Sequence, residues 1–427
     1  MENVFRKKVK KHLFEDDGNY KLYKIFIASC FFMYMTMMTV KYVFTAELTS
    51  IVLHYQSNKS QVTLANTFYY VTYAATQIIL TFFFGKINVR KYLLLTIPFA
   101  GVIYIAVAFL TNLTVLWWLF ALNGIMQAGI WSGCILLLGN YLPQELLSRA
   151  NVIMNQGANL GTIASISICS VFVGAGMWQM PFIVLGAILI VSVILFGIVA
   201  KKVISTVPKK VPTSAVHDTD TKINQALFIL DTKAKRCRFY ICPFIIIFLL
   251  NWVYYGIMGL LSPFLKETFE IEEWVSILLS IFVPLVSIMG PIFSIWYCER
   301  RKNYIKNYMI FNLISFAVLV SMIFIFDKNI VLTLICLSLI IVTTKAMTVI
   351  TSVAAFNMRM EINSGSFSAF VNAGASIAAG VAPFVISSII ETTHTYQTQY
   401  IVLAIICGVM LTIVSLTYFM TKKHARF

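Results

Sequence analysis

Residues 201–237 read KKVISTVPKKVPTSAVHDTDTKINQALFILDTKAKRC, and this is the one long polar stretch in a chain of 427 residues. It combines paired lysines, two prolines and a middle rich in Thr and Asp, a composition typical of a linker. Long apolar sequence lies on either side of it. The stretch therefore predicts a linker between two domains, at residues 25–200 and 238–421.

The sequence on both sides of this linker is strongly apolar. In the whole chain 59% of the residues are hydrophobic and only 12% are charged, about half the charged fraction of a typical soluble domain. A helix needs about 20 apolar residues to cross a bilayer. Twelve such stretches are predicted, at residues 25–51, 62–85, 92–110, 114–140, 150–173, 179–200, 238–263, 274–298, 305–326, 330–357, 366–390 and 400–421. We therefore expect an all-α membrane protein with twelve transmembrane helices in two pseudo-symmetric halves of six.

Basic residues are concentrated in alternate loops. The chain has 33 Lys and Arg against 17 Asp and Glu, a net charge of +16. With the N-terminus inside, 28 of the 33 lie on the cytoplasmic side, in agreement with the positive-inside rule. We therefore expect cytoplasmic tails at residues 1–24 and 422–427 and a cytoplasmic linker at residues 201–237. The short outer loops fit a plasma (inner) membrane location.

Soluble-enzyme signatures do not occur in the sequence. It has no Cys-x-x-Cys, no phosphate loop with Gly-Lys-Ser/Thr and no His-Glu-x-x-His. The basic residues lie in short runs between apolar stretches, which argues against a nucleic-acid-binding face. We expect a protein without enzymatic activity, cofactor, metal or nucleic-acid partner, which acts as a monomer in the lipid bilayer.

Two six-helix halves joined by a cytoplasmic loop resemble the major facilitator superfamily of transporters. Residues 85–91 after the second span, GKINVRK, resemble the superfamily's Gly-x-x-x-Asp-Arg-x-Gly-Arg-Lys loop, although Asn88 replaces its acid. Residues 299–302 after the eighth span, ERRK, occupy the matching place. In that family these loops pair charges at the inner ends of the helices. The resemblance implies gating roles for Arg90, Lys91, Glu299, Arg300 and Arg301.

Three further stretches resemble one branch of the superfamily, the organophosphate:phosphate antiporters, which carry glycerol 3-phosphate and hexose phosphates. They are YVTYAATQ (70–77), NGIMQAGIWSGC (123–134) and YGIMGLLSPFLK (255–266). That family grips phosphate with an arginine in the first span and another in the seventh, whereas this chain has Lys41 and Tyr254 there. The resemblance implies a secondary transporter that moves a small organic anion, such as a sugar phosphate or glycerol phosphate, by alternating access and anion exchange.

Lys41 and Lys345 lie deep within predicted spans, where an isolated charge costs about 2.5 to 3.5 kcal/mol. Lys41 is about sixteen residues into the first span and Lys345 about fifteen into the tenth, which runs the opposite way, so both lie at a similar depth. In the superfamily these two helices line the central cavity. The resemblance therefore implies that both lysines face one anion. The alternative is that one of them snorkels to the interface or pairs with a buried acid.

Polar and aromatic residues recur at helical spacing on other spans, and such stripes face protein or water rather than lipid. Hydrogen bonding or stacking on the substrate is expected from Tyr73, Gln77, Gln127, Trp131, Tyr254, Tyr255 and Asn155. The alternative for Asn155 is a tie between helices, because the small residues beside it allow close packing. Trp131 and Tyr255 also suit ordinary core packing.

Glu47 has two interpretations. It is either a protonatable coupling carboxylate, whose burial would favour the neutral form, or a residue at the outer mouth of the first helix. No other Asp or Glu lies in the middle of a span, which favours exchange or uniport over a proton relay.

Two rival functions remain open from the sequence. A multidrug or other small-molecule exporter fits the many Met and Phe residues, but the two buried lysines disfavour it. A non-transporting ligand sensor of the same fold would bind the ligand without flux.

Overall fold

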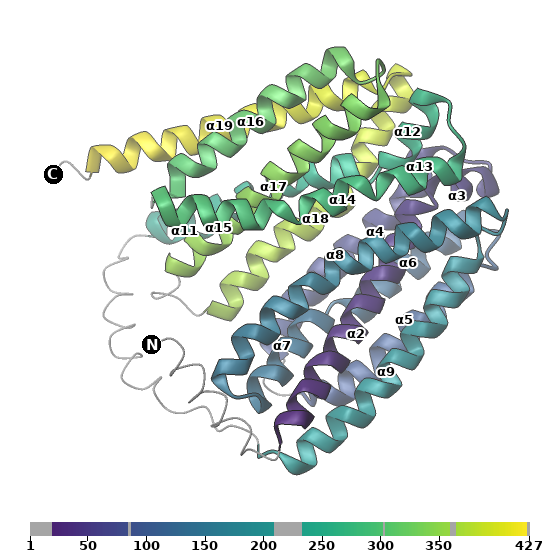
Figure 1. Ribbon diagram of the computed structural model, residues 1–427, viewed down its shortest axis with the longest axis vertical. Coiled ribbons are helices and arrows are strands. Elements are labelled where there is room, and N and C mark those ends of the chain that lie inside the picture. The colour runs from purple at the N-terminus through teal and green to yellow at the C-terminus, as the bar shows by residue number, and fades with distance from the viewer. Residues whose placement is uncertain (1–18, 84–86, 209–232, 302–303, 359–363, 425–427) are drawn as a thin grey trace, which may run out of the picture.

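The computed structural model describes residues 19–83, 87–208, 233–301, 304–358 and 364–424. Their regular structure is entirely α-helical, and the helices run lengthwise beside one another in two bundles (Figure 1). Apolar side chains from both bundles form the buried core.

The first bundle precedes the linker. It contains α2 (Tyr20–Ala46), α3 (Leu48–Tyr55), α4 (Lys59–Phe83), α5 (Val89–Val107), α6 (Leu113–Gln127), α7 (Ile130–Tyr141), α8 (Gln144–Gly174) and α9 (Met180–Thr206). Within it, α2 packs on α8 and α9, α4 on α6, and α5 on α9. Since α2–α3 and α6–α7 each continue along one path, the bundle comprises six spans.

The second bundle follows the linker. It contains α11 (Lys233–Met258), α12 (Leu261–Phe269), α13 (Glu273–Ser280), α14 (Phe282–Ser287), α15 (Met289–Arg301), α16 (Tyr304–Ile325), α17 (Ile330–Met358), α18 (Ser364–Thr393) and α19 (Gln397–His424). Here α11–α12 and α13–α14–α15 each make one span, so this bundle also comprises six. The twelve-helix architecture predicted from the sequence is confirmed for the described residues.

Four of these spans are interrupted where the sequence predicted continuous helices. The first breaks at Glu47, the fourth beside Gly129, the seventh at 259–260 and the eighth at Ile281 and Ile288. The seventh bends by 43° between α11 and α12. Broken helices give backbone and side-chain polar groups access to the interior of a bundle, as in many membrane carriers.

Ten helical segments of the described chain are long and apolar enough to cross a membrane, and the bent pair α11–α12 makes an eleventh. The helix outside this set is α4, which carries Asn66, Thr67, Thr72 and Gln77 along its length. Its polar side chains point to packing against protein rather than lipid, because an unpaired polar group in hydrocarbon is costly.

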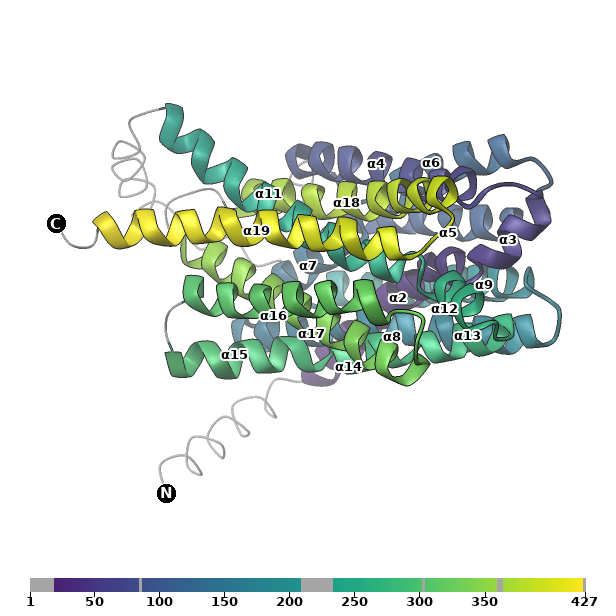
Figure 2. The ribbon, with the colours of Figure 1, turned by 90° about the horizontal axis from the view of Figure 1, so that it is seen from above.

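The two bundles meet at one end of the molecule. There α4 packs along α18, and α8 packs on α13 and α14. Figure 1 shows the bundles together where α3, α12 and α13 lie and spread apart toward the end where the C-terminus lies, and in Figure 2 α18 runs beside α4. We name the end with α3, α12 and α13 the closed end and the other the open end.

Candidate functional site

Lys41 of α2 lies against three tyrosine rings of α4. Its Nζ is 4.4 Å from the ring centroid of Tyr70, 5.0 Å from that of Tyr73 and 5.2 Å from that of Tyr69. The lysine is half-buried, whereas all three tyrosines are buried. Cation–π contacts of this kind contribute about 0.5 to 2 kcal/mol each. The rings therefore hold the ammonium group in the interior of the protein.

Lys345 of α17 has the equivalent arrangement in the second bundle. Its Nζ lies 3.8 Å from the ring centroid of Tyr254 of α11, and its side chain is also half-buried. Close packing of α15 on α17 fixes this part of the helix, because a Cβ atom at Gly290 would lie 2.5 Å from the Val342 carbonyl oxygen and 2.9 Å from the Lys345 Cβ. Gly290 thus brings α15 onto the backbone that carries the lysine.

A continuous row of tyrosines joins the two lysines across the interface between the bundles. The ring of Tyr70, in contact with Lys41, has its centroid 5.9 Å from that of Tyr255. Tyr255 in turn packs edge-on against Tyr254 at 4.9 Å, and Tyr254 contacts Lys345. The structure therefore brings Lys41, Tyr73, Tyr254 and Tyr255 into one cluster, as expected, with Tyr70 added. We call these residues together with Lys345 the lysine–tyrosine cluster.

Neither lysine of the cluster pairs with an acid among the described residues. The two ion pairs that the described structure contains, Lys59–Glu267 and Lys266–Glu273, both lie at the closed end. Glu47, the acid nearest to Lys41 in sequence, has no hydrogen-bond partner on either carboxylate oxygen. Pairing of Lys41 with a buried acid, one alternative for this residue, is therefore not what the structure shows.

Gln127 has a different environment from that expected of a substrate contact. Its side chain is fully buried. Its Oε1 accepts a hydrogen bond from the Tyr69 hydroxyl at 2.8 Å, and its Nε2 donates to the Tyr104 hydroxyl at 3.1 Å and to Asn123 Oδ1 at 2.8 Å. Because the protein itself satisfies this amide, Gln127 ties α4 and α5 to α6 and supports the Tyr69 ring beside Lys41.

The remaining predicted contacts lie around the cluster. Gln77 is buried one turn beyond Tyr73 on α4. Trp131 of α7 is half-buried and packs against Tyr34 of α2, with ring centroids 5.0 Å apart. The side chain of Asn155 is outside the described residues. A role for these residues in binding a substrate stays a prediction.

Tyr42 and Tyr70 belong to the site although the sequence analysis did not select them. The Tyr42 hydroxyl lies near those of Tyr254 and Tyr255 of the other bundle. Tyr70 adjoins the predicted stripe of Tyr69 and Tyr73. Their signal in the sequence was direct adjacency, since Tyr42 follows Lys41 and Tyr70 follows Tyr69.

The predicted gating residues make contacts within their own bundles. Arg90 donates to the Gly197 carbonyl oxygen of α9 at 3.2 Å, and Arg300 lies 4.2 Å from the Trp296 ring. Asn88 caps α5 by accepting a hydrogen bond from the Lys91 backbone N–H at 3.1 Å, which explains how a neutral residue serves at this place. The side chains of Glu299 and Arg301 are outside the described residues, so charge pairing there stays a prediction.

Polar contacts between the bundles hold the closed end together. Glu391 of α18 accepts hydrogen bonds from the Ser60 backbone N–H at 2.7 Å and from its hydroxyl at 2.5 Å, so it caps the N-terminus of α4 from the opposite bundle. The Ser50 hydroxyl donates to Glu273, and Ser170 donates to the Trp274 carbonyl oxygen at 2.9 Å.

A third acid at this end, Glu267, also joins the two bundles. Lys59 of α4 pairs with Glu267 of α12, and the Tyr396 hydroxyl donates to Glu267 at 3.0 Å. Burial and the neighbouring Glu267 carboxylate raise the pKa of Tyr396, so its phenol stays a hydrogen-bond donor at neutral pH. We call the set Ser50, Ser60, Glu267, Glu273 and Glu391 with their partners the clasp.

Glu47 lies between α2 and α3, behind the clasp. Its side chain has 0% exposure, and both of its carboxylate oxygens are buried without a hydrogen-bond partner. A residue at an open outer mouth would be in contact with solvent. The structure therefore places Glu47 inside the protein in this conformation.

Comparisons with known proteins agree with this architecture. The sequence profile of the Major Facilitator Superfamily matches residues 26–364. No curated protein sequence matches the chain.

Many solved structures are similar in fold, and three of them illustrate the likeness. A bacterial homologue of the human lysosomal transporter Spinster, inward-facing and unoccupied, has a TM-score of 0.72 at 11% identity, over 93% of this chain and 97% of that one. Its inward-facing, occupied form has a TM-score of 0.71 at 11% identity, over 94% and 97%. The nucleoside transporter NupG, in a variant form, has a TM-score of 0.66 at 14% identity, over 92% and 99%. At these identities the likeness concerns the fold.

Proposed function

The chain belongs to the major facilitator superfamily, and from that membership we propose that it carries a small organic anion across the membrane by alternating access. Membrane transport is the function of the superfamily, and the apolar helices make the chain a multi-pass membrane protein. Sugar phosphates and glycerol phosphate are the narrower substrate class that the resemblance to the organophosphate antiporters suggests, with exchange for a second anion.

One observation carries the proposal: two lysines without an acidic partner among the described residues lie on opposite bundles and are joined by tyrosine rings. An anion between Lys41 and Lys345 would neutralise both buried charges, and ammonium groups bind anionic oxygens through charge-assisted hydrogen bonds. Since the two lysines belong to different bundles, the bound anion would also connect the two parts that move in alternating access.

The tyrosines add a second property to the site. Their rings offer apolar faces and their hydroxyls offer donors and acceptors, an arrangement typical of small-molecule sites with a few placed polar groups. We expect a substrate with one anionic group and a compact body, either a ring or a short polyol, that packs on Tyr70, Tyr73 and Tyr255.

The closed end indicates the side of the membrane to which this conformation opens. The clasp holds the bundles together there, and they spread apart at the other end (Figure 1). By the positive-inside rule the open end is cytoplasmic, since the basic loops lie on that side. On this basis the conformation faces the cytoplasm and both termini lie inside. We further propose that the protein works as a monomer in the plasma membrane.

A ligand screen on the purified full-length protein tests the anion proposal. Thermal unfolding is measured with inorganic phosphate, glycerol 3-phosphate and phenyl phosphate, and with glycerol and phenol as neutral counterparts. A ligand that binds the folded state raises the unfolding temperature, so we expect a rise with the phosphates alone. Stabilisation only by neutral compounds or by the lipophilic cation tetraphenylphosphonium would contradict the proposal, and the latter would favour a multidrug exporter.

Flux in reconstituted vesicles separates a carrier from a sensor. Vesicles that contain the protein are loaded with the most stabilising phosphate ester, and uptake of the labelled ester is followed. We expect uptake that depends on Lys41 and Lys345. Stabilisation without uptake would make the protein a ligand sensor.

A further inference from the structure

We propose that a cavity within the clasp is a second binding site, for a compact organic cation, and that its ligand holds the closed end shut. The proposal goes beyond anion transport, because it concerns a different cavity and a ligand of the opposite charge. It takes from the proposed function only the motion of the two bundles that opens the closed end.

This cavity, which we call the clasp cavity, lies between the two bundles at the closed end. It has a volume of about 380 Å³. Sites for small molecules commonly have volumes of about 300 to 1,000 Å³, so a compact organic molecule fits. The first bundle lines the cavity from α3 and the start of α4, and the second from α12, the end of α18 and the segment before α19. The residues that matter most are Val52, Lys59, Glu267, Glu391, His394 and Tyr396.

The charges that line the clasp cavity favour a cation. Glu267 and Glu391 contribute two negative charges, against the single positive charge of Lys59. The loops and helix ends on the same side repeat this excess, in a chain whose net charge is +16. Their acidic residues are Glu267, Glu270, Glu272, Glu273, Asp327 and Glu391, and their lysines are Lys59, Lys266 and Lys328. A cleft with an excess of one sign of charge attracts ions of the opposite sign.

Several acceptor atoms of the cavity are open to a ligand. Both groups that bind Glu267 in the clasp use its Oε2, and its Oε1 has no hydrogen bond within the described chain. Each carboxylate oxygen of Glu391 accepts one hydrogen bond from Ser60 and keeps a further lone pair. The exposed imidazole of His394 has no hydrogen bond to any described residue. A ligand with several N–H donors and a positive charge would satisfy these acceptors.

The lining suits an organic cation better than a metal ion. The described part of the chain contains no group of three or more His, Cys, Asp or Glu side chains arranged to hold a metal. Val52, Ile390 and the ring of Tyr396 add apolar surface to the cavity. Because apolar surfaces favour contact with a hydrocarbon body, we expect an ammonium or amidinium group attached to a small apolar group.

The clasp cavity is complete only while the bundles meet at the closed end. Val52 and Lys59 belong to the first bundle, whereas Glu267 and Glu391 belong to the second. Separation of the bundles during alternating access would divide the cavity. A ligand that binds one of two conformations shifts the equilibrium toward that conformation, so a bound cation would keep the closed end shut.

Contacts between α4 and α18 separate the clasp cavity from the lysine–tyrosine cluster. One turn below Ser60 and Glu391, the hydroxyls of Thr63 and Ser387 are hydrogen-bonded at 3.1 Å. Further along, the Thr67 hydroxyl donates to the Gly380 carbonyl oxygen at 2.8 Å. A cation in the clasp cavity therefore has no path between these two helices to the anion site.

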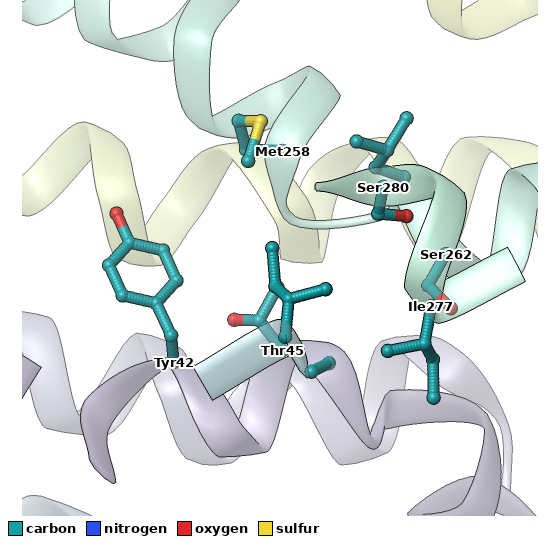
Figure 3. Close-up of a pocket in the computed structure, with 9 residues that line it drawn as sticks. Tyr42, Thr45, Met258, Ser262, Ile277 and Ser280 are labelled. Carbon is teal, nitrogen blue, oxygen red and sulfur yellow. The ribbon is translucent and has the colours of Figure 1, made fainter. Parts of the chain in front are cut away.

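The interface beside α2 is also closed to a ligand. A cavity of about 20 Å³ lies there, with room for about one water molecule. Figure 3 shows its lining, in which Tyr42 and Thr45 of α2 face Met258, Ser262 and Ser280 of the other bundle. The two proposed ligands thus bind at separate sites in this conformation.

Benzamidine and benzamide test the charge of the ligand, because the two molecules are nearly equal in shape and benzamide is neutral. Calorimetric titration of the purified full-length protein measures the affinity for each. We expect benzamidine to bind and benzamide to bind at least about tenfold more weakly, because the amidinium group makes charge-assisted hydrogen bonds with carboxylates. Equal affinities, or no binding of benzamidine, would overturn the proposal.

Three variants locate the bound benzamidine. Val52→Phe fills the cavity and leaves the hydrogen bonds of the clasp in place, and Glu391→Gln removes one negative charge of the lining. Both should weaken binding about tenfold or more. Glu270→Gln is the matched control, because it removes an exposed negative charge at the same end outside the cavity, and its affinity should stay within about twofold. Unchanged binding in Val52→Phe would place benzamidine elsewhere, and equal losses in Glu270→Gln and Glu391→Gln would show attraction to the surface alone. Either result would refute the site.

Pulsed electron paramagnetic resonance measures the effect on the closed end. Spin-labelled unnatural amino acids are placed at positions 111 and 328, in exposed loops of the two bundles outside the cavity. Benzamidine should reduce the population of long distances, and benzamide should not. A distribution that benzamidine leaves unchanged, or shifts to longer distances, would contradict a ligand that holds this end shut. Since no organic anion is present in these measurements, their failure would leave the test of anion binding unaffected.

Discussion

At the scale of single residues, the site depends on how Lys41 and Lys345 are kept inside the protein without an acid. Rings do this in both bundles: three tyrosines surround Lys41, and Tyr254 lies 3.8 Å from Lys345 Nζ. An aromatic face stabilises an ammonium group without consuming its charge. The charge thus stays available to a ligand, which a carboxylate partner would prevent.

Substitution of Tyr254 tests this role. Tyr254→Leu removes the ring and should weaken binding of phenyl phosphate about 2- to 30-fold, the equivalent of a cation–π contact of about 0.5 to 2 kcal/mol. Tyr254→Phe keeps the ring and should bind within about twofold of the wild-type protein. Calorimetric titration of both variants measures the affinities. Equal losses in the two variants would show that the hydroxyl matters and the ring does not.

The sequence predicted Lys41 and Lys345 as site residues, because a charge within a long apolar stretch needs a partner or a function. That argument does not depend on how the helices pack. The role of Gln127 depends on packing, since Tyr104 comes from another helix and completes its hydrogen bonds. The same limit applies to Glu47. Its side chain is buried because helices distant in the sequence, α8 and α13, pack near the break between α2 and α3. Such contacts cannot be predicted from the spacing of residues along the chain.

At the scale of helices, close crossings position the tyrosines. A Cβ atom at Gly124 of α6 would lie 2.1 Å from the Tyr69 carbonyl oxygen and 2.3 Å from Thr72 Oγ1 of α4. Glycine at this position lets the backbones of α4 and α6 approach closely. The Thr72 hydroxyl also donates to the Ala121 carbonyl oxygen at 2.7 Å. The face of α4 with Tyr69, Tyr70 and Tyr73 is thereby fixed against Lys41.

Gly124→Ala should lower the stability of the first bundle. The added methyl group meets backbone that cannot rotate away, and overpacking of this kind costs about 1 to 3 kcal/mol. Thermal unfolding measures the effect. Gly139→Ala on α7 is the matched control, because a Cβ atom there meets nothing within 4 Å, and its unfolding temperature should be unchanged or slightly raised. A Gly124→Ala variant as stable as this control would contradict the proposed crossing.

The sequence predicted the number of helices and their approximate limits, since a bilayer demands long apolar stretches. It did not predict the breaks at Glu47 and at 259–260, because both lie inside long apolar stretches. At the second break α11 packs closely on α18 of the same bundle, since a Cβ atom at Gly259 would lie 2.6 Å from Pro383 Cγ. The sequence did identify the polar character of α4, and the structure shows its use: α4 packs between α6 and α18.

At the scale of the whole molecule, the clasp and a close helix crossing keep the closed end shut. Below the clasp, Thr67 donates to the Gly380 carbonyl oxygen at 2.8 Å. A Cβ atom at Gly380 would lie 2.9 Å from Tyr70 Cβ and 3.1 Å from Thr67 Cα. This crossing of α4 and α18 lies between the anion site and the clasp. We therefore expect a displacement of the helices at one site to displace them at the other.

Gly380→Ala should therefore favour separation of the bundles at the closed end. The distance between spin labels at positions 58 and 392 should shift toward longer values, because the backbones can no longer approach as closely. Gly408→Ala within the second bundle is the control, since its Cβ atom would be 3.4 Å from the Phe316 ring, an ordinary contact. Identical distance distributions in the two variants would count against a role of this crossing in closure.

The central claim is that Lys41 and Lys345 bind one anion from opposite bundles. Its most direct test is a double-mutant cycle for phenyl phosphate binding, with Lys41→Gln, Lys345→Gln and the double variant, and with the exposed Lys328→Gln as control. We predict that each single change weakens binding at least about tenfold and that the double change costs less than the product of the two, because both lysines grip the same group. Binding unchanged in either single variant, or losses that multiply as for independent sites, would contradict the shared anion site.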